Sequence, residues 1–213
     1  KCSGRVEELE KILFKTPSSG NIGIGHVRWA THGVPNVVNA HPHSSDQVSV
    51  VHNGIIENSD EIKKELESKG LKFKSQTDTE VITLLITEAL KENKPLESVF
   101  KTLQKLKGSF ALGIIFKNFS NIIIGARRGS PLAVGYAKEE NYIGSDSYAL
   151  KSMTNKISYL DDGELCVLTK DLVSFYDKSL KKVNKKIHTM SENESSIDKG
   201  EYKHFMLKEI YEQ

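Results

Sequence analysis

The fold of this chain is decided by residues 23–58, which read GIGHVRWATHGVPNVVNAHPHSSDQVSVVHNGIIEN. Two apolar runs with the composition of β-strands occur in this stretch, and they end in polar residues and glycine at residues 28–33 and 52–54. Strand ends that open onto polar loops are places where a rigid scaffold can hold binding and catalytic groups. We therefore expect a functional site where these two runs end.

Arg28 and the Asn53-Gly54 pair carry the chemistry at these ends. The guanidinium of Arg28 is a planar fork of donors that suits a carboxylate. Asn53 places a side-chain amide beside the unshielded backbone N–H of Gly54, and the two donors suit an oxyanion hole for acyl transfer. Two structural alternatives remain open. Asn-Gly is the commonest two-residue hairpin turn, which spacing alone favours, and an arginine at a strand end is often a surface charge.

Longer motifs of the chain resemble those of class II glutamine amidotransferases. In chain order these are RWATHG (residues 28–33), NAHPH (39–43), VVHNGIIEN (50–58) and TDTE (77–80). Three more segments are similar to the glutaminase domain of the glucosamine-6-phosphate synthase family, namely RRGSPL (127–132), SD (145–146) and DKGEYKHFMLKEIYEQ (198–213). The resemblance covers nearly the whole chain. It implies an α+β fold, the four-layer αββα sandwich of N-terminal-nucleophile hydrolases, here lacking its first strand.

The resemblance also implies a binding site for L-glutamine. Arg28 matches the family residue that binds the α-carboxylate, and Asp78 matches the residue that takes the α-ammonium group. The loop around the substrate is shaped by the residues matching Trp29, Thr31 and His32. Opposite charges at Arg28 and Asp78 complement a zwitterionic amino acid. Spacing alone instead favours Asp78 as an N-cap, because it stands at the start of a predicted helix.

Asn53 and Gly54 match the family's oxyanion hole, which stabilises the tetrahedral intermediate formed when a thiolate attacks the side-chain amide. That thiolate belongs to an N-terminal cysteine whose own α-amine serves as the base. In the family the cysteine opens an apolar Cys-Gly strand, followed by a Tyr-Arg-Gly-Tyr-Asp-Ser-Ala-Gly segment, and neither is present here. Cys2 is a poor candidate because a residue precedes it and no apolar strand follows it. We therefore expect these 213 residues by themselves to be inactive.

The composition is that of an ordinary globular protein, with 38% hydrophobic and 27% charged residues. A net charge of +2 and a pI near 8.4 are too mild to indicate nucleic-acid binding. Cys2 and Cys166 are the only cysteines, which indicates no disulfide framework and fits a reducing cytoplasm. No apolar run approaches the length of a bilayer span and no signal peptide opens the chain, so we expect no membrane partner.

We expect a single amidotransferase domain over residues 1–213, whose last part, residues 190–213, begins a connection to sugar-phosphate isomerase domains outside this chain. The resemblance implies a parent enzyme that passes ammonia from L-glutamine to fructose 6-phosphate, forming glucosamine 6-phosphate as a homodimer without a cofactor. Two alternatives remain open. The chain is then either a glutamine-binding module without turnover or, less favoured, a metal-dependent amidohydrolase.

The metal alternative arises because five of the seven histidines fall between His26 and His52. His41 and His43 lie two residues apart, the pitch of one face of a strand. No HExxH or cysteine-pair spacing accompanies them, so we expect no metal site. The two lysine pairs within residues 181–186 are expected on a solvated strand edge rather than at a phosphate site.

Apolar periodicity predicts helices and strands in separate blocks. Helices are expected at residues 6–14, 58–69, 81–91, 95–107 and 202–211, with a short one at 146–153. Strands are expected at residues 22–27, 48–51, 109–116, 121–126, 132–136, 142–143, 157–160, 164–168, 172–176 and 183–188. Asn58 with Glu61, and Thr77 with Glu80, have the spacing of capping boxes. Strands clustered into hairpins argue for an α+β layered fold rather than alternating βαβ units.

Overall fold

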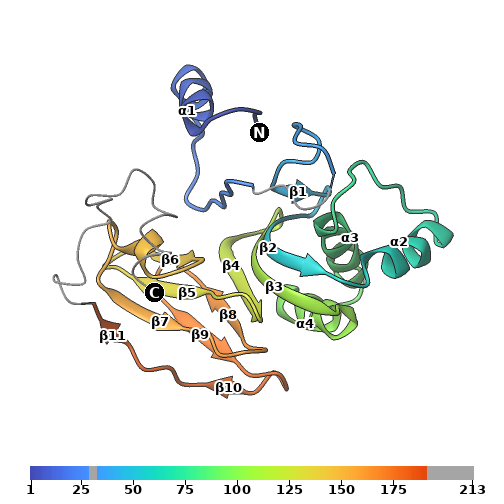
Figure 1. Ribbon diagram of the computed structural model, residues 1–213. Helices are drawn as coiled ribbons and strands as arrows, with labels where there is room; N and C mark the ends of the chain where they lie inside the picture. The colour runs from blue at the N-terminus through green and yellow to red at the C-terminus, as the bar shows by residue number, and fades with distance from the viewer. Residues whose placement is uncertain (29–32, 191–213) are drawn as a thin grey trace, which may run out of the picture.

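The computed structural model describes residues 1–28 and 33–190 and contains two antiparallel sheets (Figure 1). The seven-stranded sheet has the order β1-β2-β3-β4-β8-β9-β10, and the four-stranded sheet has the order β11-β7-β5-β6. The strands of the first are β1 (His43–Ser44), β2 (Val48–Ile56), β3 (Gly108–Phe116), β4 (Phe119–Arg128), β8 (Leu165–Leu168), β9 (Val173–Tyr176) and β10 (Lys182–Val183). Those of the second are β5 (Ala133–Tyr136), β6 (Asn141–Gly144), β7 (Lys156–Tyr159) and β11 (His188–Thr189). The helix predicted at residues 202–211 lies outside the described residues.

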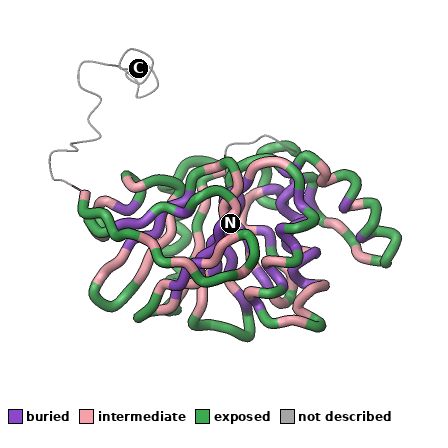
Figure 2. The backbone as a smooth tube through the Cα atoms, turned by 90° about the horizontal axis from the view of Figure 1, so that it is seen from below, coloured by how far each residue is buried: buried purple, intermediate pink, exposed green. Residues whose placement is uncertain are grey.

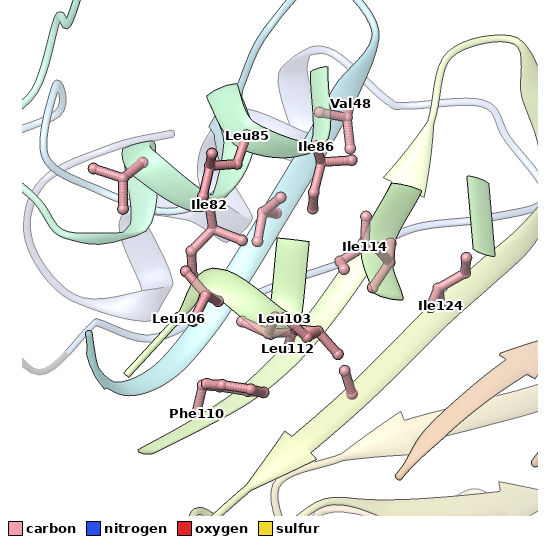
Figure 3. Close-up of a cluster of buried hydrophobic side chains, with 14 of the residues drawn as sticks. Val48, Ile82, Leu85, Ile86, Leu103, Leu106, Phe110, Leu112, Ile114 and Ile124 are labelled. Carbon is pink, nitrogen blue, oxygen red and sulfur yellow. The ribbon is translucent and has the colours of Figure 1, made fainter. Parts of the chain in front are cut away.

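Three helices pack on one face of the seven-stranded sheet: α2 (Ser59–Ser68), α3 (Thr79–Ala89) and α4 (Pro95–Lys105). The central one, α3, is enclosed on nearly all sides, because eight of its eleven residues are buried. Ile82 and Ile86 of α3 belong to the same buried cluster as Leu112 and Ile114 of β3 (Figure 3). This cluster fixes α3, and therefore the loop before it, against the middle of the sheet.

The two sheets pack face to face around a second apolar cluster. Its buried members are Ala111, Leu132, Val134, Leu160, Cys166, Leu168 and Phe175. Gly113 of β3 lets the second sheet come close, since an added Cβ there would lie 3.1 Å from the side chain of Ile143 on β6. Because β3 is covered by helices on one face and by a sheet on the other, its sequence is a nearly continuous apolar run.

The outer face of the four-stranded sheet carries a short 3-10 helix, η1 (Tyr148–Leu150). Its Leu150 packs against Gly135 and Gly144, where an added Cβ would lie 3.3 and 3.0 Å from the leucine side chain. The described chain is therefore layered as helices, sheet, sheet and one helical turn, with the buried residues in the interior (Figure 2). The α+β sandwich expected from the sequence is confirmed.

The N-terminal part of the chain packs less closely. Helix α1 (Val6–Lys15) forms where a helical period predicted one, yet it buries none of its residues. Figure 1 shows it apart from both sheets. The strand predicted at residues 22–27 is wrong, because no strand is assigned there and the segment belongs to neither sheet. An alternating apolar pattern provides a face to bury, but a strand also needs a neighbour for its backbone hydrogen bonds.

Both predicted capping boxes are wrong. The side chain of Asn58 ties the start of α2 to the end of α4, accepting from Lys107 N at 2.8 Å and donating to Lys105 O at 2.9 Å. Glu80 accepts from the backbone N–H of Ser75 at 2.6 Å, and neither α2 nor α3 receives a side-chain cap. Donors in nearby loops thus compete for side chains that otherwise cap a helix.

The structure also differs from the prediction of a single strand at residues 183–188. Residues 183–188 are divided between β10 in one sheet and β11 in the other. Lys185 lies between the two strands with only 13% of its side chain exposed, and its Nζ is 2.6 Å from Asp161 Oδ2 and 2.7 Å from Glu164 Oε2. The expectation of a solvated edge is therefore wrong for this lysine, because pairing with two carboxylates allows its burial. Within the described ranges no helix is long and apolar enough to cross a membrane.

Candidate active site

A cavity of about 350 Å³ lies where β2, the start of α3 and the N-terminal segment meet. Four of the residues predicted for binding and catalysis line it, namely Arg28, Asn53, Gly54 and Asp78. They come from three separate stretches of the sequence, and the fold brings them to one place. The three other predicted site residues, Trp29, Thr31 and His32, lie outside the described residues.

Asn53 and Gly54 lie inside β2, where both pair with residues of β3. The hairpin turn that spacing alone favoured is therefore wrong. Gly54 has a φ of +128°, and an added Cβ would lie 2.2 Å from the carbonyl oxygen of Ser109. Only glycine fits both this backbone conformation and the close approach of β3.

Asp78 stands immediately before α3 and is 7% exposed. Its Oδ2 accepts a hydrogen bond of 2.9 Å from the backbone N–H of Ile56 at the end of β2. It gives α3 no side-chain cap, and its own backbone is already helical, with φ −64° and ψ −25°. The N-cap alternative is therefore wrong, because the carboxylate is turned toward β2 at the wall of the cavity.

Arg28 brings a positive charge to the same cavity. Its Nη1 and Nη2 donate to the backbone carbonyls of Val34 at 3.2 Å and of Gly33 at 3.1 Å. The Val34 carbonyl is held in turn by Asn39, whose Nδ2 donates to it at 3.0 Å. A guanidinium oriented in this way does not fit the alternative of an isolated surface charge.

Four histidines form a cluster beside the cavity. His26 and His41 stack with their ring centroids 4.2 Å apart, and His43 meets His41 edge-on at 5.0 Å. Thr79 Oγ1 lies 3.0 Å from both His41 Nε2 and His52 Nδ1. His43 Nε2 instead lies 2.9 Å from Thr77 Oγ1, and His26 Nε2 lies 2.7 Å from Asn53 Oδ1, so the four rings do not share one partner. Among residues 1–28 and 33–190 no three His, Cys, Asp or Glu side chains are placed to hold a metal ion. This arrangement gives no support to the metal-dependent alternative.

The environment of the cluster favours neutral rings. Burial, followed by the charge of Lys1, lowers the pKa of His43 to about 4. Burial, followed by the neighbouring imidazoles and Arg28, lowers the pKa of His41 to about 2. Burial also lowers the pKa of His26. Near neutral pH the rings of His26, His41 and His43 therefore each carry one N–H donor and one bare acceptor nitrogen.

Neither cysteine of the chain lines the cavity. Cys166 is fully buried on β8 between the two sheets, and burial raises the pKa of its thiol to about 12. Cys2 is half-buried near the N-terminus. A cysteine nucleophile needs a thiolate within reach of its substrate, so neither Cys2 nor Cys166 is placed to attack a molecule bound in this cavity.

Sequence reasoning missed the residues that support the site. Thr79 was part of the TDTE motif, but its hydrogen bonds reach histidines 27 and 38 positions away. His26 was counted only toward a metal, although its Nε2 lies 2.7 Å from Asn53 Oδ1. Ser109 reaches the cavity from β3. No spacing rule could have found these contacts because each joins two different elements.

The fold and the site together define an α+β sandwich of the N-terminal-nucleophile hydrolase type. The chain is similar over 74% of its length to the solved structure of glutamine phosphoribosylpyrophosphate amidotransferase from B. subtilis in complex with ADP and GMP, with a TM-score of 0.61, 25% identity and 35% coverage of that chain. It is equally similar, over 73% of its length, to a structure described as the allosteric regulatory enzyme of purine biosynthesis, with a TM-score of 0.61, 25% identity and 35% coverage.

A family model described as a glutamine amidotransferase domain matches residues 34–152, and the chain belongs to this family. Curated relatives named glutamine–fructose-6-phosphate aminotransferase (isomerizing) match over the whole chain. They are 47% identical in Zymomonas mobilis subsp. mobilis, 49% in Mesorhizobium japonicum and 43% in Gluconobacter oxydans. The chain spans 35% of the length of each of these relatives.

Proposed function

We propose that this chain carries the glutamine-hydrolysing site of a glutamine–fructose-6-phosphate aminotransferase. The site would release ammonia for the conversion of fructose 6-phosphate to glucosamine 6-phosphate in amino-sugar biosynthesis. The observation that carries the proposal is the convergence of Arg28, Asp78 and the Asn53-Gly54 pair on one cavity. The names of the relatives support the choice of sugar.

Two opposite charges grip the amino-acid end of L-glutamine. The Arg28 fork takes the α-carboxylate, and Asp78 takes the α-ammonium group. Asp78 is suited to this because only its Oδ2 is used, by Ile56, while its Oδ1 has no hydrogen-bond partner in the described part of the chain. The side-chain amide of the bound glutamine then extends toward β2.

The oxyanion hole is formed by two donors on β2. The Ile56 N–H donates to Asp78, so it points away from β3. N–H groups two residues apart on a strand point to the same side, and the Gly54 N–H therefore also faces the cavity. Together with the side-chain amide of Asn53 it stabilises the negative oxygen that develops as the amide carbon is attacked.

The attacking thiolate is contributed, in this proposal, by a segment outside these 213 residues. Attack forms a tetrahedral intermediate, its collapse to a thioester releases ammonia, and water then hydrolyses the thioester to glutamate. A second cavity of about 1620 Å³ adjoins the first, shares His26 and Asn53 with it, and is lined by β6, an edge strand of the four-stranded sheet. An apolar strand carrying the cysteine could add to this edge and reach the oxyanion hole.

The rest of the parent enzyme is also proposed. Residues 1–213 form one amidotransferase domain, and residues 190–213 lead to sugar-phosphate isomerase domains. The share of the relatives' length that this chain leaves uncovered supports such further domains. Like the family it resembles, the full enzyme would be a cytoplasmic homodimer.

Two measurements test the proposal. Calorimetry of this chain should detect L-glutamine binding that Arg28→Ala abolishes, while the full-length enzyme should release glutamate at saturating glutamine. Binding without glutamate release by the full-length enzyme would favour the second candidate, a glutamine-binding module without turnover. That candidate draws on the absence of both cysteines from the cavity lining. The proposal is overturned if this chain does not bind L-glutamine and the full-length enzyme releases no glutamate.

A further inference from the structure

The side-chain amide of Asn53 has two orientations that differ by a half-turn about its last bond. One orientation presents the NH₂ donors to the cavity and the other presents the carbonyl oxygen. Only the first stabilises a developing oxyanion, since an acceptor at that place would repel it. Asn53 is exposed at the cavity, so burial by neighbouring side chains does not select the orientation.

A hydrogen bond to His26 selects it instead. His26 Nε2 lies 2.7 Å from Asn53 Oδ1. With its proton on Nε2 the ring donates to the amide oxygen, whereas with its proton on Nδ1 it would accept from the amide nitrogen, so the tautomer of His26 sets the orientation of Asn53. The other ring nitrogen, Nδ1, is buried and makes no hydrogen bond of good geometry within the described residues, so a proton there would lack an acceptor and Nε2 is the favoured site. This tautomer leaves the Asn53 NH₂ group on the cavity side of the amide.

The ring of His26 is itself held by packing. It stacks on His41 with an interplanar angle of 26°. His41 is anchored through its Nε2 to Thr79, whose hydroxyl is in the first turn of α3 and is 1% exposed as a residue. A chain of contacts therefore runs from the buried helix to the amide on β2. Arg28 is the charged group that faces this series of contacts, and His43 and His52 are the titratable groups that face it.

We propose that His26 is a positioning residue that fixes the side-chain amide of Asn53 with its donors toward the oxyanion. This inference rests on the proposed function, because it assigns a role within the same glutamine site. His26 lines the cavity, but the role assigned to it is to act through Asn53 rather than to bind the substrate.

The test is steady-state glutamine hydrolysis by the full-length enzyme with His26→Phe, which keeps a ring to stack on His41 but removes the donor. We expect kcat to fall about 10- to 100-fold, less than the roughly 10²- to 10³-fold fall caused by losing an oxyanion donor itself. KM for glutamine should change less than about 2-fold, because Arg28 and Asp78 still hold the amino acid. His26→Gln, whose amide nitrogen can donate in place of Nε2, should restore most of kcat. The matched control, His188→Phe on exposed β11, should leave both parameters unchanged.

A double-mutant cycle with Asn53→Ala gives the sharpest result. If His26 acts through Asn53, His26→Phe has no further effect once Asn53 is alanine. Additive effects would overturn the inference, as would an unchanged kcat in His26→Phe or no recovery in His26→Gln. If Asn53→Ala itself hydrolyses glutamine at the full rate, the oxyanion hole of the proposed function fails instead. Thermal melting of each variant separates these outcomes from unfolding.

Discussion

The cavity is bordered by two regions that are held in place in different ways. On one side, β2, β3 and α3 enclose a buried cluster, and the positions of Asn53, Gly54 and Asp78 follow from strand register and helix packing. On the other side, residues 16–28 belong to neither sheet, and Arg28 and His26 are held by individual hydrogen bonds and one ring stack. The two regions therefore contribute different things to one site.

The comparison teaches where precision and adaptability lie. The proposed oxyanion donors, Asn53 and Gly54, lie on the packed side, where rigid elements can hold catalytic groups in precise positions. Arg28, which is proposed to bind the substrate's carboxylate, lies on the loosely packed side, where few contacts must change for a ligand to enter. The predictions below test this division from the largest expected effect to the smallest.

Deleting a side chain on the packed side should cost far more stability than deleting one in α1, the helix that leads into residues 16–28. Ile82 of α3 is fully buried in the cluster, so Ile82→Ala should lower the free energy of unfolding by about 4 kcal/mol. Phe14 at the end of α1 is 88% exposed, so Phe14→Ala should change it by less than about 0.5 kcal/mol although more atoms are removed. Urea unfolding of this chain measures both. Equal losses would mean that the N-terminal region packs as tightly as α3.

Gly54→Ala tests whether the packed side tolerates any change at the oxyanion hole. The new Cβ would meet the Ser109 carbonyl at 2.2 Å, and the backbone stands at a φ of +128°, so we expect a loss of about 3 kcal/mol in stability. Glutamate release should fall with it because the Gly54 N–H would move. Gly70→Ala is the matched control, since its φ is +85° but no atom lies within 4 Å of an added Cβ, and it should cost about 1 kcal/mol. Similar losses in the two variants would contradict the close approach.

Asp78→Asn separates charge from structure at the start of α3. An asparagine oxygen can still accept from Ile56 N–H, so the fold should persist while the charge that meets the α-ammonium group disappears. We expect glutamine affinity to fall about 30- to 100-fold, equivalent to about 2–3 kcal/mol, by calorimetry. Glu88→Gln, at an exposed ion pair further along α3, is the control for a change of net charge and should bind normally. An unchanged affinity in Asp78→Asn would remove Asp78 from the site.

Much of the packed side could be predicted from the sequence, because its elements carry their own signals. The apolar stretch at residues 81–91 predicted the buried helix α3, and the runs at 109–116 and 121–126 predicted β3 and β4. Local signals failed where a partner decides the outcome. Residues 22–27 alternate like a strand but pair with no strand of either sheet. Asn53-Gly54 has the composition of a turn but lies within β2 and pairs with β3.

The candidate site divides in the same way. Arg28, Asp78, Asn53 and Gly54 were assigned roles by motif resemblance, and the fold gathers them on one cavity. The links that orient them, such as Thr79 between two histidines, were not predictable because each depends on tertiary contact between distant segments. Sequence patterns indicate which groups are available, and only the packing decides which of them touch.

The smallest expected effect is a dependence of stability on pH that arises where the two regions meet. Burial holds the pKa of His43 at about 4, whereas an imidazole in the unfolded chain titrates near 6.5. Above pH 6.5 this group is neutral in both states and adds no pH dependence. As the pH falls from 6.5 toward 4, the unfolded chain takes up a proton that the folded chain refuses, so the free energy of unfolding should fall. Full linkage between the two pKa values would give about 3 kcal/mol, which solvent screening of the ring should reduce to about 1–2 kcal/mol.

Urea unfolding at several pH values measures this slope. His43→Gln should make the slope shallower, because the group that protonates only on unfolding is gone, while glutamine can still hydrogen-bond to Thr77 as His43 does at 2.9 Å. His188→Gln, at an exposed position on β11, should leave the slope as it is. An unchanged slope in His43→Gln would contradict the prediction. It would mean that water reaches the histidine cluster, even though His26 of the N-terminal segment stacks on His41.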